Sequence, residues 1–439
     1  MTPDIYQRPA ELLQRLIQFD TTNPPGNETE IIAFINKLLT EAGLSTQILA
    51  KAPHRPNLIA RLKGRGEAPP LLLQGHVDVV TTKGQHWQVP PFEGRIADGY
   101  VWGRGALDMK GGVVMMLSSL LRAKVEGLTP PGDIILAILA DEEAGSDMGA
   151  KFLVEEHPEL FEGVRYAIGE FGGFTFYVGD QRFYPIQVAE KQICWMKATV
   201  RGPAGHGSRP IRGGAMARLG EMLLKLDRHR LAVHITPVPR QMFETMADAL
   251  GGVTGVALRG LLSPRLADRI IDLLGERGRL FDAMLHNTVS PTIVRGGDKI
   301  NVILSEVTVE LDGRLLPGQT PEDMLRELHA ILGDDVQLEV LRHDPGPPEP
   351  DMGWFDVLAA ILRELDPEGV PTSLLQVGVT DARFFARLGI QTYGFLPLKL
   401  PTDFDFASTI HAANERVPVE AIEFGAEALY RAIQRMPKA

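Results

Sequence analysis

The chain has 439 residues, 44% hydrophobic and 23% charged, which is enough for about two domains with apolar cores and excludes wholesale disorder. Its 45 basic and 56 acidic residues leave a net charge of −11, which argues against nucleic acid as a main partner. The single cysteine excludes an intrachain disulfide, and no apolar run is long enough to predict a membrane span or a signal peptide. We therefore expect a cytoplasmic protein.

The first part of the chain alternates helical and strand-like patterns. The apolar periodicity predicts helices at 11–19, 28–43 and 110–127, and strands at 57–64, 69–80 and 132–143. This alternation predicts an α/β fold with a mostly parallel sheet covered by helices. In such sheets, ligands bind beyond the carboxyl ends of the strands.

The pattern changes near residue 190. Strands with one solvent-facing side are predicted at 192–202 and 307–318, with helices at 213–232 and 321–333. Further helical pattern fills 235–290, and the Pro-rich stretch 343–353 is typical of a hinge. After the hinge, helix and strand patterns alternate again. We therefore predict an α/β domain of residues 1–190 and 350–439, interrupted by an α+β domain of residues 191–349.

Polar side chains follow several of the apolar strands. In QGHVDVV, His76 and Asp78 are two residues apart at a strand end, so they share one face. Asp108 lies in the glycine-rich turn of GRGALDMKGG, just before a helix. Each of these has an ordinary explanation when taken alone, because a loop pair and a helix N-cap are both common.

Three more stretches repeat the same placement. ADEEAGS puts Glu142 and Glu143 after a buried strand, RYAIGEFGG does the same with Glu170, and STIHAANE places His411 in a late polar loop. Two histidines with several carboxylates suit a pair of zinc ions, since imidazole and carboxylate ligate Zn²⁺ at about 2.0–2.2 Å. A bridging carboxylate lets two metal ions lie about 3.5–4 Å apart, and Mn²⁺ or Co²⁺ accepts the same ligand types.

The order GHxDVV, GRGxxDMKGG, DEExGS, a glutamate before paired glycines and a late histidine resembles the co-catalytic metallopeptidase family. That family includes aminoacylases, glutamate carboxypeptidase, acetylornithine deacetylase and succinyl-diaminopimelate desuccinylase. The opening FDTTNPPGNE (19–28) is also similar to its usual start. The resemblance implies that residues 1–190 and 350–439 form the catalytic domain, and that residues 191–349 form a lid and dimerisation domain.

The resemblance also implies the metal ligands. His76, Asp108 and Glu170 are expected to hold one divalent ion, and Asp108, Glu143 and His411 the other, with Asp108 bridging. We expect Zn²⁺, with Co²⁺ and Mn²⁺ as alternatives.

The resemblance gives two further acids roles beside the metal ions. Asp78 is expected to orient His76, as metal-bound histidines usually require. Glu142 is expected to be the general base, which takes a proton from a metal-bridging water and delivers it to the leaving amine. Asp141 has neither role, and we expect it to hold its loop by hydrogen bonds.

Three residues are expected to bind substrate. In the resembling family, the histidine of GPAGHGSRP, here His206, reaches across a dimer interface to the partner's active site, which implies a homodimer. Asn301 would contact the substrate carboxylate or the oxyanion. Arg383, in VGVTDARFF, would pair with a substrate carboxylate, where a planar fork suits a bidentate contact.

The expected function is therefore metal-dependent hydrolysis of an amide, in an N-acyl amino acid or small peptide, next to a free carboxylate. A dipeptidase or aminopeptidase of the same family is an alternative. A non-catalytic peptide- or metal-binding homologue is another, but such a protein is expected to have lost a ligand or Glu142, and none is missing here. The segment 235–290 exceeds what a minimal lid needs, and we interpret it as shaping specificity or dimer contacts.

Overall fold

The computed structural model describes residues 3–437. They form two compact units. The first contains the residues up to Val188, Pro350–Leu374 and the residues from Thr380 onward, and the second contains Ala189–Glu349 and Leu375–Val379. The short segment Leu375–Val379, which the sequence pattern grouped with residues 350–439, thus belongs to the second unit.

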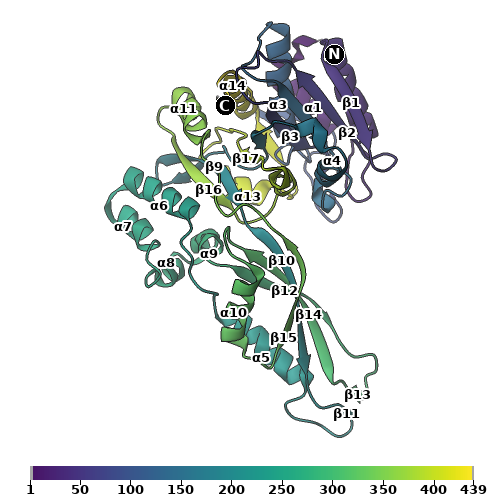
Figure 1. The fold of residues 1–439 in the computed structure, drawn as a ribbon, viewed down its shortest axis with the longest axis vertical. Coiled ribbons are helices and arrows are strands. Elements are labelled where there is room, and N and C mark those ends of the chain that lie inside the picture. Colours follow the sequence, from purple (N-terminus) through teal and green to yellow (C-terminus); the bar gives the residue numbers. More distant parts are fainter. Residues whose placement is uncertain (1–2, 438–439) are drawn as a thin grey trace. The chain divides into compact units, whose positions relative to one another are not determined.

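A large mixed sheet forms the centre of the first unit (Figure 1). Its strands are β1 (Ser45–Ala50), β2 (Pro56–Leu62), β3 (Leu71–His76), β6 (Ile134–Leu139), β7 (Tyr166–Gly169), β8 (Phe176–Val178), β9 (Gln181–Glu190), β16 (Val370–Gln376) and β17 (Gln391–Gly394). They run in the order β1-β2-β6-β3-β7-β17-β9-β16, with β8 paired to β9. The neighbouring strands β6, β3, β7 and β17 are parallel, whereas β1, β2, β8 and β9 add antiparallel pairs. The predicted α/β fold is confirmed, with its parallel part at the centre of the sheet.

Helices cover both faces of this sheet, so its central strands are completely buried. The helices are α1 (Pro9–Ile17), α2 (Thr29–Glu41), α3 (Lys110–Val125), α4 (Ala150–Glu156), α11 (Phe355–Leu365), α12 (Ala382–Phe385), α13 (Phe406–Thr409) and α14 (Val419–Gln434). Helix α3 packs on β3 and against α1 and α14, so it is buried on nearly every side. On the other face, α4 and α12 pack over apolar side chains of β2, β3 and β6.

Short elements complete the first unit. A three-stranded sheet joins β4 (Arg95–Ala97), β5 (Tyr100–Trp102) and β18 (Arg416–Pro418), so it brings residues near 100 beside residues near 416. The 3-10 helices are η1 (Pro3–Gln7), η2 (Glu142–Ala144), η3 (Pro158–Phe161) and η5 (Ala386–Leu388). The strand predicted at 132–143 therefore ends at Leu139, and its acidic end turns into η2.

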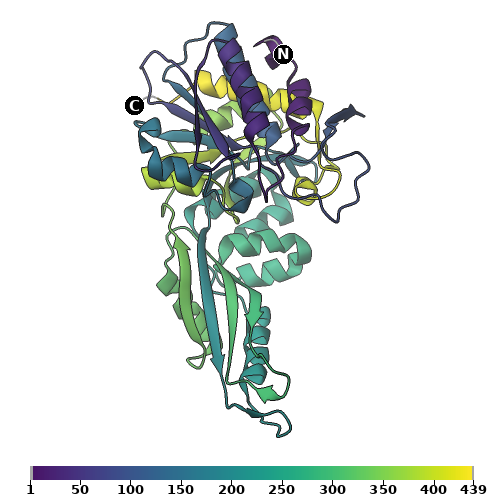
Figure 2. The same ribbon diagram turned by 90° about the vertical axis from the view of Figure 1, so that its right-hand side faces the viewer.

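The second unit is built on a four-stranded antiparallel sheet in the order β12-β14-β10-β15. These strands are β10 (Gln192–Arg201), β12 (Thr288–Arg295), β14 (Glu306–Leu315) and β15 (Gln337–Asp344). The helices α5 (Ala215–Arg228) and α10 (Pro321–Leu332) cover one face, and alternate side chains of β10 and β14 pack beneath them. Figures 1 and 2 show both helices along this sheet. A short ribbon of β11 (Gly205–His206) and β13 (Val302–Ile303) completes the strands.

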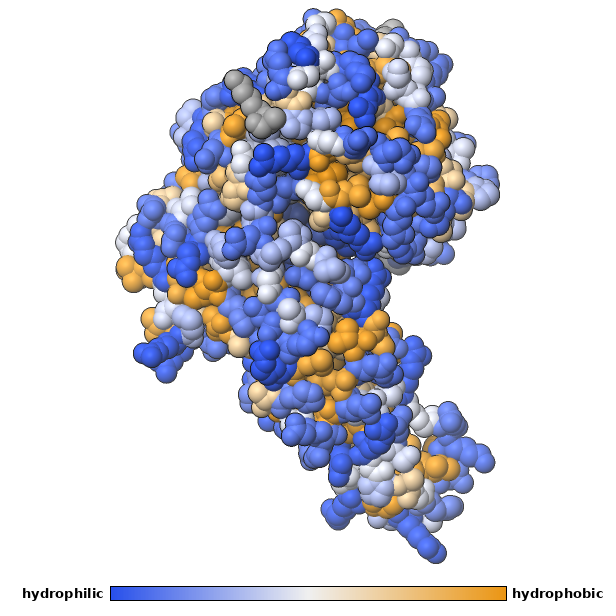
Figure 3. All heavy atoms as spheres, viewed as in Figure 1, coloured by the Kyte–Doolittle hydropathy of each residue, from blue (hydrophilic) through white to orange (hydrophobic). Residues whose placement is uncertain are grey.

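The predicted helical segment 235–290 folds into α6 (Pro237–Leu250), α7 (Gly252–Gly260), α8 (Ala267–Leu274), η4 (Gly275–Gly278) and α9 (Arg279–Leu285). This group exposes several large apolar side chains, with Val253 89% and Leu273 87% exposed. Figure 3 shows hydrophobic side chains gathered over this part of the second unit. Among the helices of residues 3–437, none combines the length and the apolar character that crossing a membrane requires.

Candidate metal centre

Five side chains from different elements of the first unit meet at one edge of its sheet. His76 is the last residue of β3, Glu143 lies in η2 after β6, and Glu170 follows β7. Because β6, β3 and β7 are parallel neighbours, their carboxyl ends lie side by side. Asp108 comes just before α3, and His411 comes just after α13.

The first group of candidate ligands consists of His76, Asp108 and Glu170. His76 Nε2 lies 3.2 Å from Asp108 Oδ1 and 3.4 Å from Glu170 Oε2. One ring nitrogen therefore faces two carboxylate oxygens, and His76 is only 1% exposed. One donor atom from each of these residues lies within 4.8 Å of the others.

The second group consists of Asp108, Glu143 and His411. His411 Nε2 lies 3.1 Å from Asp108 Oδ2 and 3.3 Å from Glu143 Oε1. Asp108 thus presents one oxygen to each group, which is the arrangement of a bridging carboxylate. The predicted juxtaposition of these five residues is what the structure contains, whereas their roles as metal ligands stay predictions.

The clustered carboxylates of the two groups of candidate ligands are stabilised only if protons or cations neutralise them. Burial raises the pKa of Glu170 to about 7, and burial likewise raises the pKa of Glu143 above its ordinary value. The carboxylates of Asp108 and Glu143, 3.1 and 3.3 Å from its Nε2, raise the pKa of His411 to about 10. In the protein alone, protons on imidazole and carboxylate would therefore neutralise these acids, and a divalent cation can take the place of those protons.

The donor set also fits divalent ions chemically. Glu143 Oε1 is buried and has no hydrogen-bond partner among residues 3–437, although it lies within 3.3 Å of His411 Nε2. A buried carboxylate oxygen of this kind is costly unless a cation or a donor satisfies it. Imidazole nitrogens and carboxylate oxygens suit Zn²⁺, Mn²⁺ or Co²⁺, so the residues present fit a pair of such ions.

Asp78 connects His76 to the acidic loop. Its Oδ1 lies 3.4 Å from His76 Nδ1, and the same ring nitrogen lies 3.0 Å from the Asp78 carbonyl oxygen. Its two carboxylate oxygens accept hydrogen bonds from the backbone N–H groups of Glu142 and Glu143, both at 3.2 Å. Asp78 therefore touches the first group through His76 and the second through the backbone of Glu143.

Glu142 differs from its neighbour Glu143, because Glu142 belongs to neither group of candidate ligands. Burial, with a contribution from the carboxylate of Glu170, raises the pKa of Glu142 well above its ordinary value. A carboxyl group with a raised pKa can both accept and return a proton near neutral pH.

The predicted hydrogen-bonding role of Asp141 matches its contacts. Its backbone is left-handed, with φ of 72°, and its carboxylate accepts hydrogen bonds from Asn23 at 3.0 Å, from Arg55 at 2.9 Å and from Met148 N at 3.0 Å. Arg55 also pairs with the buried Glu28 at 2.8 Å. Asn23 donates to Asp78 as well, so one side chain ties the acidic loop to the end of β3. A non-glycine residue keeps such a backbone only when its surroundings hold it.

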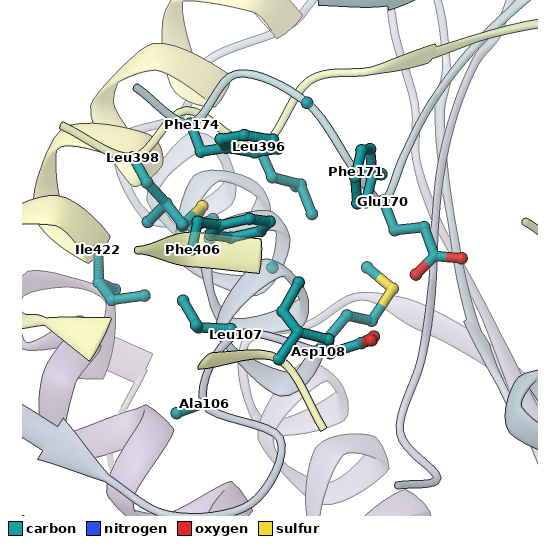
Figure 4. Close-up of a pocket in the computed structure, with 16 residues that line it drawn as sticks. Ala106, Leu107, Asp108, Glu170, Phe171, Phe174, Leu396, Leu398, Phe406 and Ile422 are labelled. Carbon is teal, nitrogen blue, oxygen red and sulfur yellow. The ribbon is translucent and has the colours of Figure 1, made fainter. Parts of the chain in front are cut away.

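An apolar cavity adjoins the first group of candidate ligands. It encloses about 30 Å³ and is lined by Phe171, Phe174, Phe406 and aliphatic side chains, among others. Figure 4 shows the carboxylates of Asp108 and Glu170 together at one side of these apolar residues. The rings of Phe174 and Phe406 stack with centroids 3.9 Å apart, which packs the segment after Glu170 against the segment before His411.

The remaining predicted residues lie elsewhere. His206 and Asn301 belong to the second unit, where Asn301 O accepts a hydrogen bond from Gly207 N at 2.8 Å and His206 pairs with Val302 across the short ribbon. Arg383 lies in α12 of the first unit and is 8% exposed, and its buried Nε has no hydrogen-bond partner among the described residues. The substrate contacts predicted for these three residues stay predictions.

The sequence patterns did not single out the residues that support the ligands. Arg104 and Glu415 form a buried ion pair beside Asp108, and Gln85 contacts the backbone of His411. Arg104 and Glu415 belong to the same quoted motifs as Asp108 and His411, so their position in those motifs was the available signal. Nothing local in the sequence indicates that they meet, because 311 residues separate them.

The fold and the two groups of candidate ligands are those expected of a metallohydrolase. The chain belongs to peptidase family M20/M25/M40, whose sequence profile matches residues 72–435. A N-fatty-acyl-amino acid synthase/hydrolase, PM20D1 from Homo sapiens, is 30% identical over 386 residues, which cover 83% of this chain and 74% of that protein. Aminoacylase-1 from Sus scrofa is 25% identical, covering 88% of this chain and 86% of that protein.

Solved structures show the same fold. Human carnosine dipeptidase 1 superposes with a TM-score of 0.66 at 16% identity, covering 98% of this chain and 96% of that one. Peptidases and acyl-amino acid hydrolases thus occur among the relatives.

Proposed function

We propose that the protein hydrolyses the amide bond of N-acyl amino acids, next to the free carboxylate of the product amino acid. The observation that carries this proposal is the pair of ligand groups that share Asp108, with Glu142 beside them but in neither group. Such an arrangement supports hydrolysis by water and requires no covalent intermediate.

His76, Asp108 and Glu170 would hold one divalent ion, and Asp108, Glu143 and His411 the other. When bound, such ions polarise the scissile carbonyl and lower the pKa of a hydrolytic water. Asp78 would keep His76 in the tautomer and orientation that leave Nε2 free to ligate.

Glu142 would act as the general base and then as the general acid. It would accept a proton from the attacking water as the oxygen of that water bonds to the carbonyl carbon. As the carbon–nitrogen bond breaks, Glu142 would return this proton to the leaving nitrogen, so that the products are a carboxylic acid and an amine. The raised pKa of Glu142 supports this exchange.

Two features support an acylated substrate with a free carboxylate. The apolar cavity beside Asp108 and Glu170 suits an apolar acyl group, and its volume of about 30 Å³ suits only a short part of a chain, so a longer acyl group would extend beyond it. Arg383, whose buried Nε has no hydrogen-bond partner within residues 3–437, supports recognition of the carboxylate, with His206 and Asn301 as further substrate contacts. The activities for which PM20D1 and aminoacylase-1 are named agree with this substrate class.

A panel of substrates tests the proposal. The metal-free protein, reloaded with Zn²⁺, Co²⁺ or Mn²⁺, would be assayed on N-acetyl, N-octanoyl and N-lauroyl amino acids, on the matching amino acid amides, and on dipeptides. We expect turnover of the N-acyl amino acids and loss of turnover for the amides, which lack the carboxylate. Turnover of dipeptides alone would contradict the proposal in favour of a dipeptidase. Binding without cleavage of any amide would favour a non-catalytic homologue.

A further inference from the structure

A buried ion pair lies between the two segments that carry Asp108 and His411. Strands β5 and β18 pair with Trp102 opposite Arg416, and Gly103 N donates to Glu415 O at 2.9 Å. This pairing brings Arg104 and Glu415 together, with Arg104 Nη1 2.6 Å from Glu415 Oε2. The two residues are 1% and 0% exposed.

The carboxylate of Glu415 holds the backbone of the shared ligand Asp108. While Oε2 of Glu415 pairs with Arg104, Oε1 accepts hydrogen bonds from Leu107 N at 2.8 Å and from Asp108 N at 3.2 Å. These bonds fix the turn that presents Asp108 to both groups of candidate ligands. An apolar residue at 415 could fill the space but could not satisfy these two N–H groups.

The guanidinium of Arg104 holds the backbone of His411. Its Nη2 donates to the carbonyl oxygen of His411 at 3.1 Å and to Gln85 Oε1 at 2.8 Å, and Gln85 Nε2 donates to the same His411 oxygen at 2.7 Å. His411 has a left-handed backbone, with φ of 60°. A non-glycine residue occupies this region only where its surroundings hold it there, and these two hydrogen bonds do so.

We propose that Arg104 and Glu415 are positioning residues that keep Asp108 and His411 at the spacing needed for both to ligate one divalent ion. This inference rests on the ligand assignment of the proposed function, but it does not depend on the substrate. The pair touches neither group's donor atoms directly and acts through the backbones of the two ligands. Because the charges of Arg104 and Glu415 cancel, the pair positions the candidate ligands but does not neutralise their carboxylates, which still require a cation.

The direct test is Glu415→Gln, which keeps the size of the side chain but removes its charge. Chelator competition with Zn²⁺ and Co²⁺ would measure the affinity for each ion in the absence of substrate. We expect the affinity for the ion held by Asp108, Glu143 and His411 to fall by about 10–100-fold, the range found when supports of metal ligands are removed. The absorption spectrum of the Co²⁺-loaded protein should change as well, because the ligand geometry of that ion changes. The other ion should be weakened less, because it shares only Asp108 with this group.

Gln85→Leu is a milder second variant, since Gln85 is only partly buried and its loss removes one of the two bonds to the His411 carbonyl. This variant should lower the affinity for the same ion, but to a smaller extent. Asp366→Asn is the matched control, because Asp366 is a buried partner of Arg182 and Tyr184 in the same unit but belongs to neither group of candidate ligands. It should lower the melting temperature yet leave both affinities and the Co²⁺ spectrum unchanged.

The inference would be overturned if Glu415→Gln kept the metal affinities and the Co²⁺ spectrum of the wild type. If Glu415→Gln does not fold, the same result in Gln85→Leu would overturn it. Equal loss of metal affinity in Asp366→Asn would also overturn it, because the effect would then be a general loss of stability. If the wild-type protein binds two ions but cleaves no N-acyl amino acid, the proposed substrate is wrong, while the positioning role is still decided by the metal affinities.

Discussion

The carboxylate of Asp78 lies 3.4 Å from Nδ1 of His76 and accepts hydrogen bonds from the backbone N–H groups of both Glu142 and Glu143. A single buried acid therefore sets the direction of a histidine at the end of β3 and the path of the loop after β6. The two loop glutamates are adjacent in sequence, but only Glu143 joins a ligand group. Separate substitutions should distinguish the functions of these three acids.

Glu142→Gln should strongly reduce turnover while leaving metal binding intact. Glutamine has nearly the same size, but it cannot accept a proton from water and return it to the leaving nitrogen. We expect kcat to fall by about 10²–10⁴-fold, the usual contribution of a general base. Steady-state kinetics and metal analysis on the same preparation would check this. Full activity in Glu142→Gln would rule out the assigned role.

Glu143→Gln should fail in a different way. An amide is a much weaker ligand than a carboxylate, and Glu143 Oε1 is buried without a hydrogen-bond partner among residues 3–437. We expect the metal content to fall from two ions per chain towards one, and activity to recover in part at high metal concentration. Two tightly bound ions in this variant would show that Glu143 is not a ligand.

Asp78→Asn should weaken metal binding although it preserves the shape of the side chain. In the protein, Asp78 Oδ2 accepts from Asn23 Nδ2 at 2.8 Å and from Glu143 N, and Oδ1 accepts from Glu142 N. Whichever way the asparagine amide turns, its NH₂ group faces a donor, so His76 and the loop lose their common support. We expect metal affinity to fall by about 10–100-fold, measured by chelator competition. An unchanged affinity would contradict this account.

His286 should contribute stability to the second unit that is lost as the pH rises. Although burial lowers the pKa of His286, its hydrogen bonds to Asp282 raise that pKa above the ordinary value of 6.5, and Asp268 lies 3.1 Å from its other ring nitrogen. Because the folded form binds this proton more tightly, its contribution is complete below pH 6.5 and is lost as pH rises through the raised pKa.

Urea unfolding between pH 6 and pH 9 would check this. The stability advantage of wild type over His286→Gln should shrink as the pH rises over this range, with His329→Gln in the same unit as the control. Parallel pH profiles for wild type and His286→Gln would contradict the prediction.

The exposed apolar side chains of α7 and α8 can be tested for a role in dimer contacts. If the segment 235–290 makes dimer contacts, then replacing Val253 and Leu273 with glutamate should shift the protein towards monomer, because each residue is almost fully exposed in the single chain. Sedimentation velocity would measure the shift, and the substrate panel would show whether specificity changes instead. If neither property changes, this interpretation of the segment is wrong.

The sequence by itself determined the α/β class and the five residues that meet at the candidate metal centre. Strand periodicity is local, and the carboxyl ends of parallel neighbouring strands meet at one edge, so His76, Glu143 and Glu170 could be placed together from their positions after apolar runs. The tertiary structure alone decided what holds these ligands. Arg104 meets Glu415 across 311 residues through the pairing of β5 with β18, and Asn23 joins Asp78 to Asp141 across 55 and 118 residues. Contacts of this kind depend on long-range packing and leave no periodic pattern in the sequence.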